Sequence, residues 1–114
     1  MKRIENISDD AFQTVHIALD DGTVIDLTLN YLAAIQRWKF DLSHPNLTVY
    51  GKVLCHHPNM LRVFKKTINF GLGCIVSDGA DPIDVEDFVN GRVSLYVLNA
   101  DEVQYAEDVI NNAN

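Results

Sequence analysis

Side chains that could bind a metal lie near the middle of the chain. Cys55, His56 and His57 are consecutive, and Cys74 follows further along. Cysteine and histidine are zinc ligands, but adjacent residues on a strand point in opposite directions, and a tetrahedral site takes its local pair from positions about two to four residues apart. The spacing therefore argues against zinc. Buried free thiols beside solvated or hydrogen-bonded histidines are the simpler interpretation.

A second candidate is the irregular stretch 78–90, which contains five of the sixteen acidic residues. Calcium takes about six to eight oxygen ligands, and carboxylates supply them well. The order of the acids in residues 78–87 does not match an EF-hand loop, and Pro82, Ile83 and Val85 interrupt it. We predict a solvated loop that packs Phe88 against the core.

Catalytic patterns are equally weak. Neither His16 nor His44 has a serine or cysteine nucleophile with a placed carboxylate that the sequence can identify. The run from Gly71 to Gly73 is not followed by a helix, so it does not fit a phosphate-binding loop. We expect no enzyme, no cofactor, no metal and no small-molecule substrate.

The elements that would position any site are strands. Residues 23–31 and 37–42 both alternate apolar and polar side chains, which places the apolar ones on one face of a pleated strand. Joined by a short break, the two runs predict an antiparallel hairpin with one buried face. The apolar positions of this hairpin are Ile25, Leu27, Leu29, Tyr31, Trp38, Phe40 and Leu42.

Further strands are predicted over residues 12–19, 47–54, 70–77 and 92–98. Gly22 closes an Asp-Asp-Gly turn that should pair the first strand with the second. Gly51 inside a strand indicates a bulge or bend. Gly71 and Gly73 leave one strand face nearly bare, so we expect close packing there, with the Trp38 ring or another large ring as the partner.

Helices are predicted at two places. Apolar residues at 60, 61, 64 and 68 fit one or two helical turns, with Asn59 as a plausible N-cap. Near the end of the chain, Asp101 can cap a helix in which Val103, Ala106 and Ile110 share one face.

Together these elements predict a mainly β fold, a small antiparallel barrel or sandwich of about six strands. A short helix lies between strands four and five, and a second helix ends the chain. We divide the sequence into an N-terminal arm (1–11), a β domain (12–98) and a C-terminal helix or extension (99–114). The residues expected to define the core and fold are Tyr31, Trp38, Phe40, Gly51, Leu61, Gly71, Gly73 and Leu95.

Composition narrows the class of partner. The chain has 114 residues and a formal net charge of −7, and among its nine basic residues the only close group of three is Arg62, Lys65 and Lys66. Nucleic-acid binders depend on clustered positive charge, so we expect no nucleic acid partner. No apolar run approaches the ~18 residues that span a bilayer, and the N-terminus lacks the apolar core of a secretion signal. We therefore expect a cytoplasmic setting and no membrane contact.

The order of these features resembles a known family. The features are an Asn-Tyr pair at residues 30–31, Trp-Lys-Phe-Asp-Leu at 38–42, the run 47–51, Met-Leu at 60–61, Gly-Leu-Gly at 71–73, Asp-Pro at 81–82, Asp-Phe at 87–88 and the strand 92–97. Over residues 12–98, this order is similar to that of the small baseplate plug proteins of contractile-tailed bacteriophages, the type described in a cyanophage baseplate. The arm and the C-terminal helix fall outside the pattern.

The resemblance implies a structural virion protein. It implies a location in the tail baseplate after assembly in the host cytoplasm, contacts with hub, wedge or tube proteins, and multiple copies per particle. Unpaired strand edges, the acidic arm and the terminal helix are suitable docking elements. Two alternatives remain open from the residues alone: a small acidic β domain that acts as a cytoplasmic binding or regulatory adaptor, and a small hydrolase that uses His16 or His44.

Overall fold

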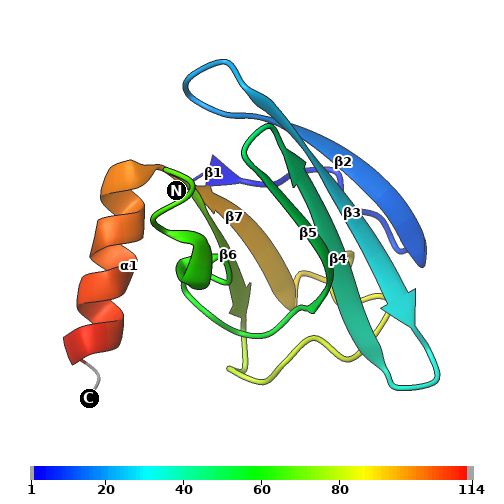
Figure 1. Cartoon of the computed structure of the whole chain (residues 1–114). Helices are drawn as coiled ribbons and strands as arrows, with labels where there is room; N and C mark the ends of the chain where they lie inside the picture. The colour runs from blue at the N-terminus through cyan, green and yellow to red at the C-terminus, as the bar shows by residue number, and fades with distance from the viewer. Residues whose placement is uncertain (1, 113–114) are drawn as a thin grey trace.

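The computed structural model describes residues 2–112, which form a pair of antiparallel sheets and a C-terminal helix (Figure 1). Met1 of the predicted arm and residues 113–114 of the predicted extension lie outside the described part. The elements are β1 (Lys2–Arg3), β2 (Phe12–Ala18), β3 (Val24–Leu32), β4 (Arg37–His44), β5 (Leu47–Val53), the 3-10 helix η1 (Arg62–Phe64), β6 (Gly71–Val76), β7 (Val93–Leu98) and α1 (Ala100–Asn112).

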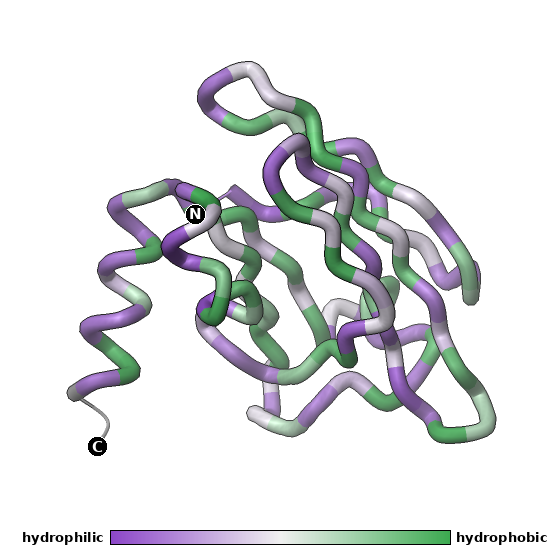
Figure 2. The backbone as a smooth tube through the Cα atoms, in the orientation of Figure 1, coloured by the Kyte–Doolittle hydropathy of each residue, from purple (hydrophilic) through white to green (hydrophobic). Residues whose placement is uncertain are grey.

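The larger sheet is a meander in the order β2-β3-β4-β5. The predicted hairpin is confirmed as β3 and β4, in which Leu29 lies opposite Phe40 and Tyr31 lies opposite Trp38. Burial alternates along both strands, as a period of two requires. Figure 2 shows the same alternation as hydrophobic and hydrophilic residues following one another along the strands.

The predicted bulge at Gly51 is also confirmed. The register of the β4–β5 pair shifts between Phe40 and Leu42. Gly51 has a φ of 64°, which residues other than glycine seldom adopt. The Asp41 carboxylate accepts a hydrogen bond from the Gly51 N–H at 2.6 Å, so it replaces a ladder bond that the bulge removes.

The smaller sheet has the order β1-β7-β6 and includes part of the predicted arm. Lys2 pairs with Val97, the Ile4 N–H donates to the Leu95 carbonyl oxygen at 2.8 Å, and the Ile4 side chain is 8% exposed. In residues 2–112 the strands number seven, so the prediction of about six was low. A two-residue charged strand has no alternation, and its partner strand lies near the other end of the sequence.

The two sheets form a sandwich-like fold, and within the described residues no strand pairing closes them into a barrel. The barrel alternative is therefore wrong. The core lies between the sheets and is filled from both by large side chains. Those with almost no exposed surface are Ile25, Leu27, Leu29, Trp38, Phe40, Leu42, Leu54, Leu61, Leu72, Val93 and Leu95.

The short helix differs from its prediction. Only Arg62–Phe64 is helical, as a 3-10 turn, and because β1 adds a strand it follows the fifth strand of the structure. Met60 precedes the helical turn, and its N–H donates to the Leu72 carbonyl oxygen at 2.7 Å. Residues 57–60 therefore bond to the edge of β6 before the 3-10 turn begins.

The C-terminal helix α1 packs beside β6 and β7 (Figure 1). Its cap is Asn99, and the predicted cap Asp101 lies inside the helix. The Glu102 N–H donates to Asn99 Oδ1 at 2.9 Å, and the Asn99 N–H donates to Glu102 Oε1 at 3.0 Å, which is a capping box. In the described part of the chain, no helix is both long and apolar enough to cross a membrane.

Candidate interaction surfaces

Residues 56–60 lie along the edge of β6 that does not pair with β7. The His57 N–H donates to the Cys74 carbonyl oxygen at 3.0 Å, and the Cys74 N–H donates to the His57 carbonyl oxygen at 2.9 Å. The Val76 N–H donates to His56 Nδ1 at 3.0 Å. Backbone and side-chain atoms of this segment therefore replace the strand that β6 lacks on this side.

The Nδ1 atoms of His56 and His57 both accept backbone hydrogen bonds. The Nδ1 atom of His57 accepts the Asn59 N–H at 2.9 Å, and that of His56 is engaged by Val76. Burial lowers the pKa of His57, which agrees with a neutral ring that accepts at Nδ1. Among residues 2–112, no three histidine, cysteine or acidic side chains are grouped to hold a metal ion.

The cysteines are free thiols in the described chain. Burial raises the pKa of Cys74 to about 12 and also raises the pKa of Cys55. Both thiols are protonated near neutral pH, and a thiol is a far weaker nucleophile and metal ligand than a thiolate. Cys74 is buried and Cys55 is half-buried, and both behave as small apolar side chains.

Gly71 and Gly73 provide close packing, but the predicted partner is wrong. A Cβ atom on Gly71 would lie 2.6 Å from Asn59 Oδ1, and one on Gly73 would lie 2.9 Å from the Pro58 carbonyl oxygen. Residues 58–59, and not the Trp38 ring, fill the bare strand face. The polar Asn59 side chain gives no periodic signal, although it is 2% exposed.

The Trp38 ring instead contacts the irregular stretch 78–90, which we call the acidic loop. Its Nε1–H donates to the Asp84 carbonyl oxygen at 2.9 Å, and the Tyr31 hydroxyl donates to the Ile83 carbonyl oxygen at 2.7 Å. Phe88 meets the indole edge-on, with ring centroids 5.1 Å apart. The predicted docking of Phe88 on the core is confirmed, and the loop is fastened to the larger sheet by aromatic residues.

Asp78 and Asp87 of this loop bond to groups in and beside it. The Asp87 side chain is 2% exposed, and its Oδ2 accepts the Ile83 and Asp84 N–H groups at 2.9 Å and the Arg92 guanidinium at 2.7 Å. The N–H of Ala80 and the Arg92 guanidinium also lower the pKa of Asp78. These carboxylates brace the loop, which is a structural role.

The other histidines contact structural partners. The exposed His16 lies 2.5 Å from the Asp26 carboxylate across the β2–β3 pair. His44 Nδ1 accepts the Asn46 N–H at 3.1 Å, and its ring packs against Phe70. The His16 contact is a cross-strand pair, and the hydrogen bond to His44 lies within a turn.

The residues expected to define the fold occupy different environments. Trp38, Phe40, Leu61 and Leu95 are fully buried, and Tyr31 is half-buried at the rim of the core. The remaining three are glycines, of which Gly51 is exposed at the bulge and Gly71 and Gly73 are buried under residues 58–59.

An ion-pair cluster anchors α1. Glu107 is 7% exposed and accepts hydrogen bonds from Arg62 Nε at 2.8 Å and Lys65 Nζ at 2.7 Å. These two bases belong to the group formed by Arg62, Lys65 and Lys66. The clustering was visible in the sequence, but nothing there marked Glu107 as its partner.

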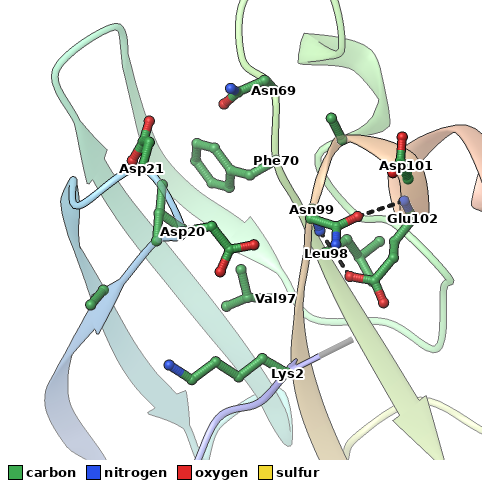
Figure 3. Close-up of a pocket in the computed structure, with 13 residues that line it drawn as sticks. Lys2, Asp20, Asp21, Asn69, Phe70, Val97, Leu98, Asn99, Asp101 and Glu102 are labelled. Atoms are coloured by element: carbon green, nitrogen blue, oxygen red, sulfur yellow. Dashed lines mark hydrogen bonds between the residues drawn. The ribbon is translucent and has the colours of Figure 1, made fainter.

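A cleft of about 340 Å³ opens at the turn end of β2 (Figure 3). Asp20 and Asp21 of the β2–β3 turn and Asp101 of α1 supply negative charge, and Lys2 is a basic residue on its wall. Figure 3 shows Asp20 extending its carboxylate into the cleft above Val97. The cleft therefore combines an acidic rim with an apolar floor.

Large apolar side chains are also exposed away from this cleft. Phe12 on β2 is 68% exposed and Tyr50 on β5 is 80% exposed. Val63 in η1 and Tyr105 on α1 are similarly exposed. They lie on four separate elements, β2, β5, η1 and α1.

Residues 2–112 thus form a small two-sheet β protein whose candidate chemical groups hold its own backbone in place. A family model described as cyanophage baseplate Pam3 plug gp18 matches residues 1–101. The chain belongs to this phage baseplate plug family, and the match supports a structural role in a phage baseplate and contact with other baseplate proteins.

The match corrects one boundary of the resemblance. Residues 1–11 fall inside the matched range, so the arm belongs to the family pattern, in agreement with its strand β1 in the smaller sheet. Most of α1 lies beyond residue 101. A search of curated proteins found no match.

Proposed function

We propose that this protein is a non-catalytic structural component of the tail baseplate of a contractile-tailed phage. In this role it is assembled in the host cytoplasm, is present in several copies per particle, and holds hub, wedge or tube proteins by its surfaces. The observation that carries the proposal is the family match over residues 1–101. The internal bonding of histidine and acidic side chains supports a role without catalysis.

The architecture suits such a role. Both sides of the smaller sheet are braced, since Ile4 bonds to Leu95 of β7 on one side and residues 56–60 cover the edge of β6 on the other. The acidic loop is fastened by Trp38 and Tyr31. A domain with few loose segments can transmit force between neighbours without changing shape.

The test is incorporation into particles. A phage in which the gene is disrupted would be supplied with the protein from a plasmid, and purified tails would be analysed by mass spectrometry. We expect the protein in the tails and a loss of complete baseplates without it. Its absence from tails that still assemble would contradict the proposed function.

The −7 charge keeps a second function open, that of a soluble acidic adaptor. An adaptor of this kind would bind a basic protein outside the particle, with an affinity that falls steeply as salt is raised. Such binding together with absence from purified tails would favour the adaptor over the baseplate component.

A further inference from the structure

We propose that the free edge of β2 binds an extended segment of a neighbouring protein, which adds a strand to the larger sheet and carries basic residues beyond the strand. This inference rests on the proposed function, because it names the contact by which the protein would hold its neighbour. Strand addition gives affinity through backbone hydrogen bonds, and side chains on either face give specificity.

The first step is the direction of the backbone groups of β2. The Tyr31 N–H donates to the Ala11 carbonyl oxygen at 2.6 Å, and the Leu19 N–H donates to the Thr23 carbonyl oxygen at 2.7 Å. Bonding alternates along an antiparallel pair, so odd-numbered residues between these points face β3. The N–H and C=O groups of Phe12, Thr14, His16 and Ala18 therefore point away from it.

The second step is that these groups have no partner. Over residues 2–112, no hydrogen bond joins the outward N–H and C=O groups of β2 to another residue. The side chains of Phe12, Thr14, His16 and Ala18 are all exposed. The pairing of β2 with β3 runs without a register shift over its seven residues, so the edge offers an uninterrupted row of backbone groups to an added strand.

The third step compares the other strand edges of the described chain. β6 is covered by residues 56–60, β5 is bent by its bulge at Gly51, and β1 is a two-residue strand of Lys2 and Arg3. Coverage, bulges, shortness and charge are the devices that protect edges from unwanted pairing. β2 has no such device and contains neither proline, glycine nor lysine.

The charge around β2 selects the occupant. Asp9 and Asp10 precede the strand, and Asp20 and Asp21 follow it, all of them exposed. A second copy pairing with β2 in either direction would bring these aspartate pairs together, and like charges on paired strands repel. A segment with lysine or arginine at its ends would instead meet opposite charge.

The cleft at the end of β2 gives this segment a place for a basic side chain. Ala18, the last residue of β2, lines the cleft together with Asp20, Asp21 and Asp101 (Figure 3). A strand that runs along β2 past Ala18 reaches this acidic rim. Lysine and arginine can bury their methylene stems on an apolar floor while keeping the charge at the rim.

The test compares two substitutions at one position. Thr14→Pro removes an outward N–H and places a ring in the path of an added strand, and proline is tolerated where an edge N–H faces solvent. Thr14→Val is the matched control, because both variants lose the hydroxyl contact with Thr28 at 3.1 Å. Tails would be prepared from the plasmid-supplied phage, with wild type measured in parallel.

We expect incorporation of Thr14→Pro to fall about tenfold, as the loss of a backbone bond and a steric block imply, while Thr14→Val stays within about twofold of wild type. Asp20→Asn with Asp21→Asn should lower incorporation by several-fold. Equal incorporation of Thr14→Pro and wild type would overturn the β2 inference. Absence of wild type itself would instead contradict the proposed function.

Hydrogen exchange on the wild-type chain provides a readout that does not depend on a variant folding. The N–H groups of Thr14 and His16 should exchange quickly in the isolated protein and slowly in purified tails. Unchanged exchange in tails would overturn the inference. A dimer of the isolated protein that Thr14→Pro dissolves would overturn the assignment of the occupant, because a second copy would then cover the edge.

Discussion

The indole Nε1–H of Trp38 donates a hydrogen bond to the backbone carbonyl oxygen of Asp84, at a distance of 2.9 Å. This contact joins a core strand to the longest irregular segment of the chain. The same indole packs edge-on against Phe88 of that segment. Trp38 therefore fills the core and orders the acidic loop at the same time.

Replacing Trp38 should cost much of the fold's stability. Trp38→Ala removes a fully buried ring, and we expect the free energy of unfolding to fall by ~3 to 5 kcal/mol. Trp38→Phe keeps an aromatic ring but loses the donor to Asp84, and should cost about 1 to 2 kcal/mol. Urea denaturation measures both. A cost below ~1 kcal/mol for Trp38→Ala would mean that the ring contributes little to the core.

Asn59 and Gly71 should be energetically coupled. Asn59 Oδ1 accepts the buried N–H groups of Leu61 and Leu72, so Asn59→Ala should cost about 2 to 4 kcal/mol. Gly71→Ala forces its new methyl group against the Asn59 side chain and should cost about 1 to 3 kcal/mol. In the double variant the clash is absent, so we expect the combined cost to fall short of the sum. Strict additivity in a double-mutant cycle would contradict the contact.

Asp87 and Asp84 offer a matched pair of charge removals. Asp87→Asn disturbs a buried carboxylate that binds Arg92 and two backbone N–H groups, and should destabilise by about 2 to 4 kcal/mol. The Asp84 side chain is exposed, so Asp84→Asn should change stability by no more than about 0.5 kcal/mol. Chemical denaturation of the two variants is the measurement. Equal effects would show that net charge, and not the bonding of Asp87, governs the loop.

Acid should loosen the attachment of α1. Hydrogen bonds from Lys65 and Arg62 lower the pKa of Glu107 below its ordinary value of 4.5. Because the folded-state pKa is lowered, the stabilisation is fully present above 4.5 and is lost as the pH falls through the lowered value. Glu107→Gln should therefore be less stable than wild type near about pH 7, and the difference should vanish at low pH.

Thermal unfolding of wild type and Glu107→Gln across this pH range measures the effect. Asp108→Asn is the control, since Asp108 is an exposed acid on the same helix that bonds only to Gln104 within the described residues. It should follow the wild-type curve. A constant difference between wild type and Glu107→Gln at every pH would contradict a charge-dependent anchor.

The regular strands were predictable because their signal is local. Alternation along residues 23–42 identified the hairpin of β3 and β4 and its buried face, and Gly51 identified the bulge. These features depend on residues close together in the chain. The order of such features also carried the family resemblance, which the match over residues 1–101 confirms.

The contacts between distant segments were not predictable. The glycine at position 71 was enough to predict close packing. It could not identify Asn59 as the neighbour, because that contact depends on how residues 56–60 run along β6. The arm was assigned outside the domain, although Ile4 lies in the core, because two charged residues give no strand pattern. The burial of Glu107 was also not predictable, because an acid on a helix is ordinarily solvated.

The sequence by itself determined that this is a small mainly β protein, where its hairpins turn, and which faces are apolar. Only the tertiary structure decided that the sheets stay open as a sandwich and that β2 has an uncovered edge. The physical reason is that side-chain periodicity records which face of a strand is buried. It does not record whether backbone groups on the strand's two edges find partners, because every residue carries the same N–H and C=O.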